Sequence, residues 1–333
     1  MHRAVEKRNK EFVDTTINVS VIIPNYNHAS FLKQRIDSIL NQTYQDFEVI
    51  ILDDCSTDSS VQVIEAYRGH RKISHIVINE QNSGSPFLQW KKGIQLAKGE
   101  WIWMAESDDW CEPNFLEELT SKIKDKVSIL FCQSIFIDQD GKRIFQSRWP
   151  SDYEEIYGSD FISDYLTKGC YIVNASMCIF RQKYFEEVSS DFTRYKFIGD
   201  WVLWHKMASK GNVIVSGKQL NYFRKHDADV SGKAFKQGLS YTEYFTFLDS
   251  LPTDKILSLK DRREVVALRF YEFLNDTRME RQYRVRIKSL FHTKLGYKFY
   301  LHQTKHWLVK NIKTPLFTRL GIRRPQFQNF SRY

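Results

Sequence analysis

Four short apolar runs recur along the N-terminal part of the chain at intervals of about 25–30 residues, and this regularity constrains the fold more than any other feature. We expect them to be buried strands over residues 19–23, 47–52, 73–78 and 101–105. The segments between them carry apolar residues at helical spacing. Strands that alternate with helices in this way predict βαβ units, and therefore an α/β fold with a mostly parallel sheet covered by helices.

Polar residues follow each of these strands, at 25–27, 53–54, 82–84 and 107–109. The carboxyl ends of parallel strands meet at one edge of a sheet, and ligands bind there. Adjacent carboxylates such as Asp108 and Asp109 repel each other unless a cation or hydrogen-bond donors compensate them. A divalent ion shared with substrate phosphates is the usual solution. A pair that merely ends the strand and caps the next helix stays open as an alternative.

The turn after the first strand reads Pro-Asn-Tyr-Asn-His over residues 24–28. A dinucleotide-binding fold or a phosphate-binding P-loop would need glycines at such a turn. Phosphates must therefore be held by something other than a glycine-rich loop. A metal on the acids at 108–109, which we expect on the exposed edge of the sheet, would serve this purpose.

The composition is that of a globular protein. The 333 residues are 42% hydrophobic and 15% aromatic, which is enough to build a sizeable core. The five cysteines include no C-x-x-C pair, and this predicts reduced thiols rather than disulfides or a zinc site. The N-terminus lacks the apolar run of a signal peptide, and no run is long enough to span a membrane. We therefore expect a cytoplasmic location.

The net charge of +9 comes from the C-terminal tail, because residues 281–333 contain 13 Lys or Arg and no Asp or Glu. The rest of the chain has a net charge of −4. A nucleic-acid partner is disfavoured because no recognition module accompanies this charge. A solvated helix is possible, but large apolar side chains interleave with the basic ones, as in interfacial helices. We favour binding of residues 281–333 to an anionic membrane surface at the inner face of the cell membrane.

Five segments together resemble the family 2 glycosyltransferases, of the bacterial surface-polysaccharide type: residues 19–27, 38–48, 52–58, 97–102 and 107–109. The resemblance covers roughly residues 17–232 and implies the GT-A fold, a nucleotide-binding, Rossmann-like sheet with flanking helices. It implies nucleotide-sugar binding in residues 17–110, and an acceptor side with the catalytic base in residues 111–232. The helical, basic region 233–333 would follow this domain.

The resemblance also implies roles for residues of the first domain half. Pro24 and Tyr26 would line the pocket for the base and ribose, and Asp54 would hydrogen-bond the base, typically uracil. Asp108 would face the ribose, and Asp109 would hold Mg²⁺ or Mn²⁺ at the diphosphate. Asp53 is the more structural member of its pair.

In the second half, Asp200 is the candidate catalytic base. The family usually has Glu-Asp at this position, and here Gly199 replaces the Glu. Inverting transfer needs one base on the acceptor hydroxyl. Arg224 and His226 match a family segment near the diphosphate, where positive charge would stabilise the leaving group. A helix-capping Asp200 and a solvated loop around Arg224 are the alternatives.

The leading hypothesis is therefore a metal-dependent, inverting hexosyl- or N-acetylhexosaminyltransferase. It would use a nucleotide-sugar, with a UDP-sugar favoured, and a glycan or lipid-linked acceptor in cell-surface polysaccharide synthesis. An inactive module that binds nucleotide-sugars or glycans is the alternative, but the set of Asp54, Asp108, Asp109 and Asp200 argues against it. A nucleotidyltransferase would need a glycine-rich basic loop, which residues 24–28 do not supply.

Overall fold

The computed structural model describes residues 18–188, 190–226, 230–252 and 258–308. The predicted membrane-binding segment therefore lies only partly within the described residues. The four predicted strands all form, and they pair in parallel in the order β3-β2-β1-β4. They are β1 (Val19–Asn25), β2 (Phe47–Asp53), β3 (Ile73–Ile78) and β4 (Trp101–Met104). The helices between them are α1 (Ala29–Leu40), α2 (Ser60–Glu65) and α3 (Pro86–Leu96).

Beyond β4 the sheet becomes mixed, because antiparallel strands join the predicted parallel ones. Its order continues β4-β9-β6-β10-β5, and β9 runs antiparallel to both of its neighbours. Strand β9 starts beside the end of β4 and runs back along that strand, so the two strands are antiparallel. The strands are β5 (Trp110–Cys111), β6 (Val127–Ile137), β7 (Arg143–Gln146), β8 (Tyr153–Ile156), β9 (Cys178–Arg181) and β10 (Asn212–Arg224).

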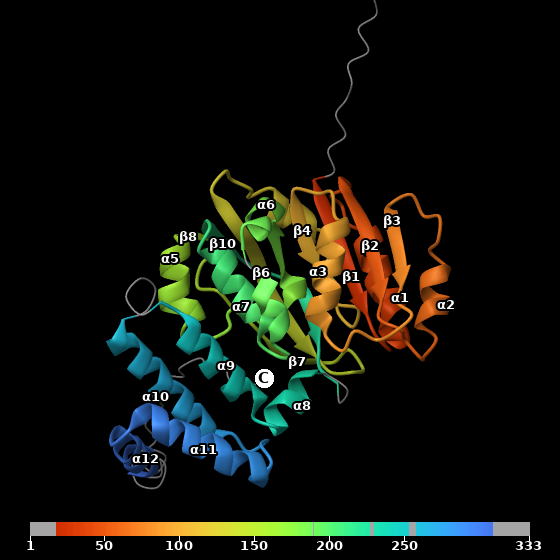
Figure 1. The fold of residues 1–333 in the computed structure, drawn as a ribbon. Coiled ribbons are helices and arrows are strands. Elements are labelled where there is room, and N and C mark those ends of the chain that lie inside the picture. Colours follow the sequence, from red (N-terminus) through yellow and green to blue (C-terminus); the bar gives the residue numbers. More distant parts are fainter. Residues whose placement is uncertain (1–17, 189, 227–229, 253–257, 309–333) are drawn as a thin grey trace, which may run out of the picture.

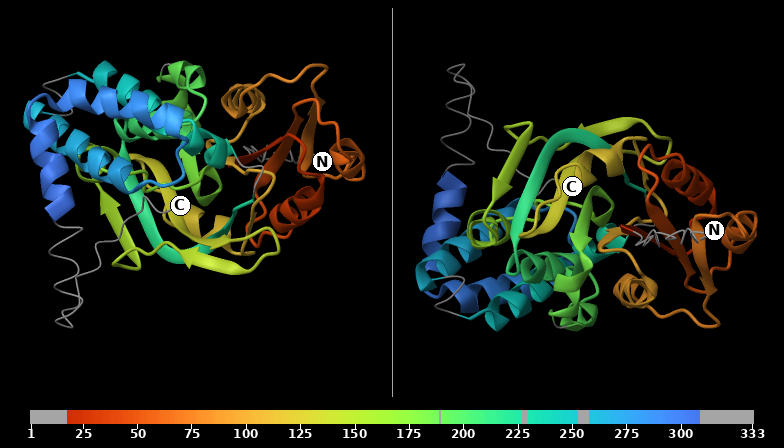
Figure 2. Two further views of the ribbon diagram at one scale, coloured as in Figure 1. Left: turned by 90° about the horizontal axis from the view of Figure 1, so that it is seen from below. Right: turned by 90° about the horizontal axis from the view of Figure 1, so that it is seen from above.

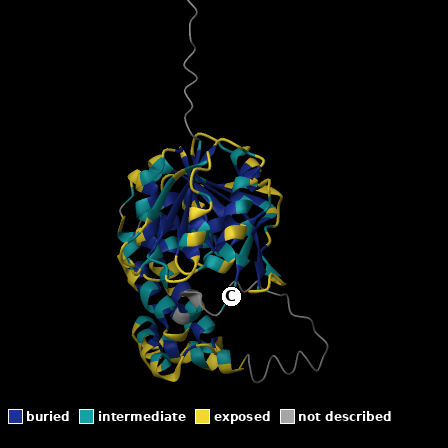
Figure 3. Ribbon diagram, turned by 90° about the vertical axis from the view of Figure 1, so that its right-hand side faces the viewer, coloured by how far each residue is buried: buried dark blue, intermediate teal, exposed yellow. Residues whose placement is uncertain are grey.

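Helices cover both faces of this sheet. The views of Figure 2 show α3 and α7 on one face and α1 on the other. The helices and turns of this part are α4 (Phe115–Thr120), α5 (Gly158–Asp160), a π-helix η1 (Phe161–Leu166), η2 (Ala175–Met177), α6 (Gln182–Glu186), η3 (Ser190–Arg194) and α7 (Gly199–Ala208). Figure 3 shows that buried residues concentrate in the sheet. Within this core, the Trp103 ring stacks on Phe115 with 4.3 Å between centroids.

The C-terminal region is helical, as predicted, and it lies beneath the β10 end of the sheet in Figure 1. Its helices are α8 (Val230–Lys236), α9 (Leu239–Ser250), α10 (Leu259–Asn275), α11 (Arg281–Leu295) and α12 (Lys298–Leu308). The buried Phe270, Phe273 and Phe291 form an aromatic core between α10 and α11. The predicted domain boundary at 232/233 falls inside α8, and the division into domains stays a prediction. Among the described residues, no helix has the length and apolar content to cross a membrane.

Candidate active site

A cleft of about 1100 Å³ opens between the carboxyl edge of the sheet and helices α7, α9 and α10. Its walls bring together residues that are far apart in the sequence, and the predicted site residues Asp108, Asp200 and Arg224 all border it. The strand ends supply one wall because β1 and β4 run in parallel and stop at the same edge. Helices from the C-terminal region supply much of the opposite wall.

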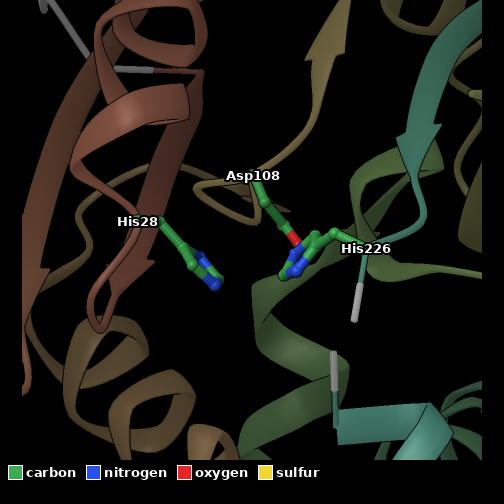
Figure 4. A group of neighbouring side chains, drawn as sticks. All are labelled: His28, Asp108 and His226. Atoms are coloured by element: carbon green, nitrogen blue, oxygen red, sulfur yellow. The ribbon is translucent and has the colours of Figure 1, made fainter. Parts of the chain in front are cut away.

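Three side chains converge at the edge of the sheet: His28, Asp108 and His226 (Figure 4). One ligand atom from each lies within 4.8 Å of the other two. The Nε2 atom of His226 lies 3.0 Å from Oδ2 of Asp108, and the ring centroids of the two histidines are 5.4 Å apart. They come from the loop after β1, the loop after β4 and the segment after β10. Imidazole nitrogen and carboxylate oxygen are suitable ligands for Mn²⁺ and similar ions.

The charges of these groups suit cation binding. Burial alone would raise the pKa of Asp108, but the hydrogen bond from His226 and the nearby imidazoles hold that pKa below its usual value. Burial lowers the pKa of His28, with Asp108 acting in the opposite direction. The result is an ionised carboxylate beside an imidazole that stays neutral at lower pH than usual. Both are the protonation states that a metal ligand needs.

Asp109 lies in a different environment from Asp108. It is only 1% exposed, so the expectation that both acids lie on the exposed edge is wrong for this residue. Its Oδ1 accepts the backbone N–H of Arg224 at 3.0 Å, and its Oδ2 accepts a hydrogen bond from the Asn174 amide. Burial and the charge of Asp108 raise the pKa of Asp109 to about 7. Its predicted role as the metal ligand stays a prediction.

Arg224 is buried, and its guanidinium donates hydrogen bonds to the loop after β4, to the turn between β6 and β7, and to α1. Its Nε donates to the carbonyl of Asp108 at 2.9 Å, and its Nη1 donates to the carbonyl of Gln139 at 2.9 Å. Its Nη2 donates to Oε1 of Gln34 at 3.0 Å. The guanidinium also lies over the Phe31 and Trp110 rings. These contacts fix the Asp108 loop against α1 and against the turn between β6 and β7, while the predicted role of Arg224 in donor binding stays a prediction.

Of the remaining predicted donor residues, Pro24 lies in β1, Tyr26 lies on the loop after β1, and Asp54 lies on the loop after β2. Asp54 is 5% exposed, and its carboxylate accepts hydrogen bonds from Asn79 at 2.8 Å, Gln89 at 2.7 Å and the Ser83 hydroxyl at 2.8 Å. Tyr26 is 46% exposed on the loop after β1, whereas Pro24 is buried within β1. No contact of the described residues tests whether these three bind a base and ribose.

Asp53 has the structural role that the sequence favoured. Its Oδ2 accepts hydrogen bonds from the Asn25 amide and the Ser56 hydroxyl, both at 2.7 Å. Its Oδ1 accepts the backbone N–H of Ser56 at 2.9 Å. The residue therefore ties the end of β2 to the end of β1, and so shapes the edge of the sheet.

Asp200 lies at the start of α7 on the opposite side of the cleft. Its Oδ1 accepts the backbone N–H of Trp201 at 2.7 Å. Burial raises the pKa of Asp200 to about 7, with a further contribution from the charge of Glu243. A carboxyl with such a pKa can take up a proton near neutral pH.

The glycine before Asp200 has a clear structural reason. A Cβ at Gly199 would lie 2.6 Å from the Phe87 ring and 2.7 Å from the carbonyl oxygen of Phe192. No side chain fits there without movement of α3 or of the segment before α7. The close packing of Phe87 and the Phe192 carbonyl therefore requires glycine at position 199 in this chain.

Sequence reasoning missed two residues, His28 and Glu243. His28 directly follows the Pro-Asn-Tyr-Asn turn, so its position at the sheet edge was a usable signal. Glu243 lies in α9, and its carboxylate accepts hydrogen bonds from the backbone just before α7. No local pattern marks it, because the contact joins segments more than 40 residues apart.

The sequence pattern of the family described as Glycosyl transferase family 2 matches residues 20–189, about half of the chain. This chain belongs to that family. An uncharacterized glycosyltransferase of Rickettsia typhi is 28% identical over 249 residues, which is 73% of this chain and 75% of that protein. The glycosyltransferase described here also shares its fold with solved structures of the GT-A class.

One of these is S. aureus TarS 1-349 in complex with UDP, with a TM-score of 0.51 and 20% identity, covering 91% of this chain and 92% of that one. Another is the mannosyltransferase PcManGT from Pyrobaculum calidifontis in complex with GDP-Man and Mn²⁺. Its TM-score is 0.52 with 14% identity, covering 92% of this chain and 85% of that one. At these identities the likeness establishes the fold alone.

Proposed function

We propose that this enzyme transfers a sugar, with inversion, from a nucleotide-sugar to a glycan or lipid-linked acceptor in cell-surface polysaccharide synthesis. The observation that carries the proposal is that Asp108 and Asp200 face one cleft from opposite walls. Asp108 has a lowered pKa and therefore suits the binding of a cation. Asp200 has a raised pKa and therefore suits the uptake of a proton. A UDP-sugar is favoured because the family resemblance assigns Asp54 to uracil, with Pro24 and Tyr26 beside the base and ribose.

The residues that would hold Mn²⁺ or Mg²⁺ are Asp108, His28 and His226. Two imidazoles favour Mn²⁺, because Mg²⁺ prefers oxygen ligands and keeps its waters. When bound, the ion would neutralise the charge of the donor diphosphate. Asp109 is not one of these three residues, and each of its carboxylate oxygens already accepts a hydrogen bond, from Asn174 or from the backbone of Arg224. We therefore assign Asp109 to holding the loop in place of the metal role predicted from sequence.

Asp200 would act as the general base on the acceptor hydroxyl. The carboxyl of Asp200 is buried at the start of α7, and this burial raises its pKa to about 7. The ionised carboxylate can therefore accept a proton from a substrate near neutral pH. Positioning an acceptor hydroxyl against a single carboxylate is what inverting transfer requires. Across the cleft, Arg224 would act indirectly, by fixing the loop that carries Asp108.

A donor screen tests this function. Thermal shifts would be measured with UDP-, GDP- and dTDP-sugars, each with Mn²⁺ and with EDTA, followed by assays of nucleotide release. We expect stabilisation by UDP-sugars that needs the metal, and UDP release that Asp200→Asn lacks. Binding without any release, in wild type and variant alike, would favour the inactive binding module.

We also propose that the basic C-terminal region contacts an anionic membrane surface. Residues 281–308 contain seven Lys or Arg and no acid. Along α12 and the residue before it, large side chains are exposed at helical spacing: Tyr297, Tyr300, Leu301, Trp307 and Leu308. Basic residues next to exposed aromatic ones are typical of interfacial helices. His302 and His306 of α12 bond to Tyr271 and Asn275, which border the cleft, so a surface touching α12 would lie close to the cleft.

Vesicle flotation tests this contact. Deleting residues 281–333 would expose the core around Phe291, so the better variant is Leu301→Gln with Trp307→Gln. We expect it to bind phosphatidylglycerol vesicles more weakly than wild type, and salt to weaken wild-type binding. Leu259→Gln, an equally exposed leucine at the start of α10, is the matched control. Equal flotation of all three proteins would contradict the proposal.

A further inference from the structure

Glu243 reaches from α9 to the backbone that precedes the helix of the candidate base. Its Oε1 accepts the N–H of Lys196 at 2.8 Å. Its Oε2 accepts the N–H groups of Phe197 at 2.9 Å and Ile198 at 3.1 Å. The residue at the N-cap of α7 is Ile198, whose side chain cannot accept a hydrogen bond. A carboxylate from another helix thus satisfies backbone donors that the local sequence leaves without a capping group.

This contact bears directly on Asp200, which is the second residue of α7. The segment 196–198 sets where that helix begins and hence where its first side chains point. The residue next to Asp200 cannot share this task, because Gly199 has no room for a side chain beside Phe87. An acceptor for the N–H groups of residues 196–198 comes instead from α9, through Glu243.

The charged and titratable groups around Asp200 are few among the described residues. Glu243 from α9 acts on it through charge, and the thiols of Cys170 and Cys178 also lie within electrostatic reach. Arg269 of α10 lies over the Trp201 ring, but it is paired with Glu272 at 2.6 Å. Burial is the main cause of the raised pKa of Asp200, and the charge of Glu243 adds to it.

We propose that Glu243 is a positioning residue that holds the start of α7, and with it Asp200, in place across the cleft from Asp108. This rests on the proposed role of Asp200 as the base. It also makes α9 part of the catalytic machinery, although α9 lies beyond the domain 17–232 that the sequence predicts. Because the carboxylate of Glu243 is negative, it also shifts the ionisation of Asp200 to higher pH.

The test compares Glu243→Ala, Glu243→Gln and Glu243→Asp in the full chain, with Glu264→Gln on an exposed part of α10 as control. The readouts are UDP release from UDP-glucose and UDP-N-acetylglucosamine with Mn²⁺, its pH dependence, and UDP affinity by calorimetry. In Glu243→Ala we expect kcat to fall about 10- to 100-fold, because Asp200 would no longer be held in position against the acceptor hydroxyl. The affinity for UDP should stay at the wild-type value, since the wall of the cleft that carries Asp108 is unchanged. Glu243→Asp should recover part of the rate.

Glu243→Gln keeps an acceptor oxygen but removes the charge, so the rising limb of its pH profile should move to lower pH. A merely structural residue would not move that limb. If Glu243→Ala fails to fold, Glu243→Gln is the deciding variant. The proposal is overturned if Glu243→Gln has the wild-type kcat and the rising limb of its pH profile lies at the wild-type pH. Asp200→Asn is measured alongside. Wild-type rates in Asp200→Asn would show that the base assignment is wrong, whereas an inactive Asp200→Asn beside fully active Glu243 variants would refute the positioning role alone.

Discussion

Asp108 on the sheet wall of the cleft and Asp200 on its helix wall are held in opposite ways. Asp108 accepts a hydrogen bond from His226, and this bond and the nearby imidazoles hold the pKa of Asp108 below its usual value. On the helix wall, Asp200 accepts the N–H of its own neighbour, and burial raises its pKa to about 7. Donors stabilise the charged form, and burial destabilises it. Asp108 is thus suited to carry a fixed negative charge, and Asp200 to take up and release a proton.

The largest effect that we expect comes from removing the proton acceptor of the helix wall. Asp200→Asn keeps the size of the side chain but cannot take a proton, so kcat should fall by about 10²- to 10⁴-fold. UDP affinity should be unchanged, because the sheet wall is untouched. In wild type the rate should rise with pH through about 7, because only the ionised carboxylate is a base. Rate assays from pH 5 to 9 check both points.

A variant that still transfers sugar at near the wild-type rate would place the base elsewhere. Asp227, the acid that directly follows His226 in the sequence, lies outside the described residues. Asp191 is a poorer candidate, because it is paired with Lys206 at 2.6 Å and with Arg194 at 3.3 Å.

A second effect should appear on the sheet wall as lost stability. Arg224→Met removes the guanidinium that joins the Asp108 loop to Gln34 and Gln139. We expect the free energy of unfolding to fall by about 3 kcal/mol, because several buried acceptors lose their donor. Urea denaturation measures it, with Arg224→Lys as a milder change. If Arg224→Met keeps its stability and loses kcat instead, the guanidinium acts on the leaving diphosphate after all.

The smallest effect concerns the packing behind Asp200. Gly199→Ala places a methyl group against Phe87 and the Phe192 carbonyl, and we expect a loss of about 1–3 kcal/mol in stability. A shift in thermal melting checks this. The double variant with Phe87→Leu should recover part of the loss, because it relieves the contact with the ring but not that with the backbone. Full stability of Gly199→Ala would show that the start of α7 is looser than its contacts imply.

The difference between the walls also explains what the sequence could predict. The strands β1 to β4 and their polar ends follow from local patterns, because each strand and its loop are contiguous in the chain. The different environments of Asp108 and Asp109 do not follow from local patterns, since both residues lie in a turn where strand alternation has ended. The environment of Asp109 is set by Asn174 and by the backbone of Arg224, which is 115 residues away. The antiparallel β9 and the Glu243 contact are likewise set by long-range packing.

The family resemblance supplied the residue types of the site but not their orientation. Asp200 was found because it opens an aromatic helix after a glycine, and the structure places it beside the cleft as expected. His28 was overlooked because its neighbours in the turn carried the resemblance. Only the three-dimensional arrangement brings it to within reach of Asp108 and His226.

The central claim is that the sheet wall binds the donor through a metal held at Asp108. Calorimetric titration of UDP with Mn²⁺ into wild type, Asp108→Asn and Asp109→Asn tests it most directly. We predict that Asp108→Asn loses Mn²⁺-dependent affinity by at least about 100-fold. Asp109→Asn should bind UDP with near wild-type affinity while melting at a lower temperature, because its buried hydrogen bonds are weakened. The reverse result, with affinity lost in Asp109→Asn and kept in Asp108→Asn, would contradict the account.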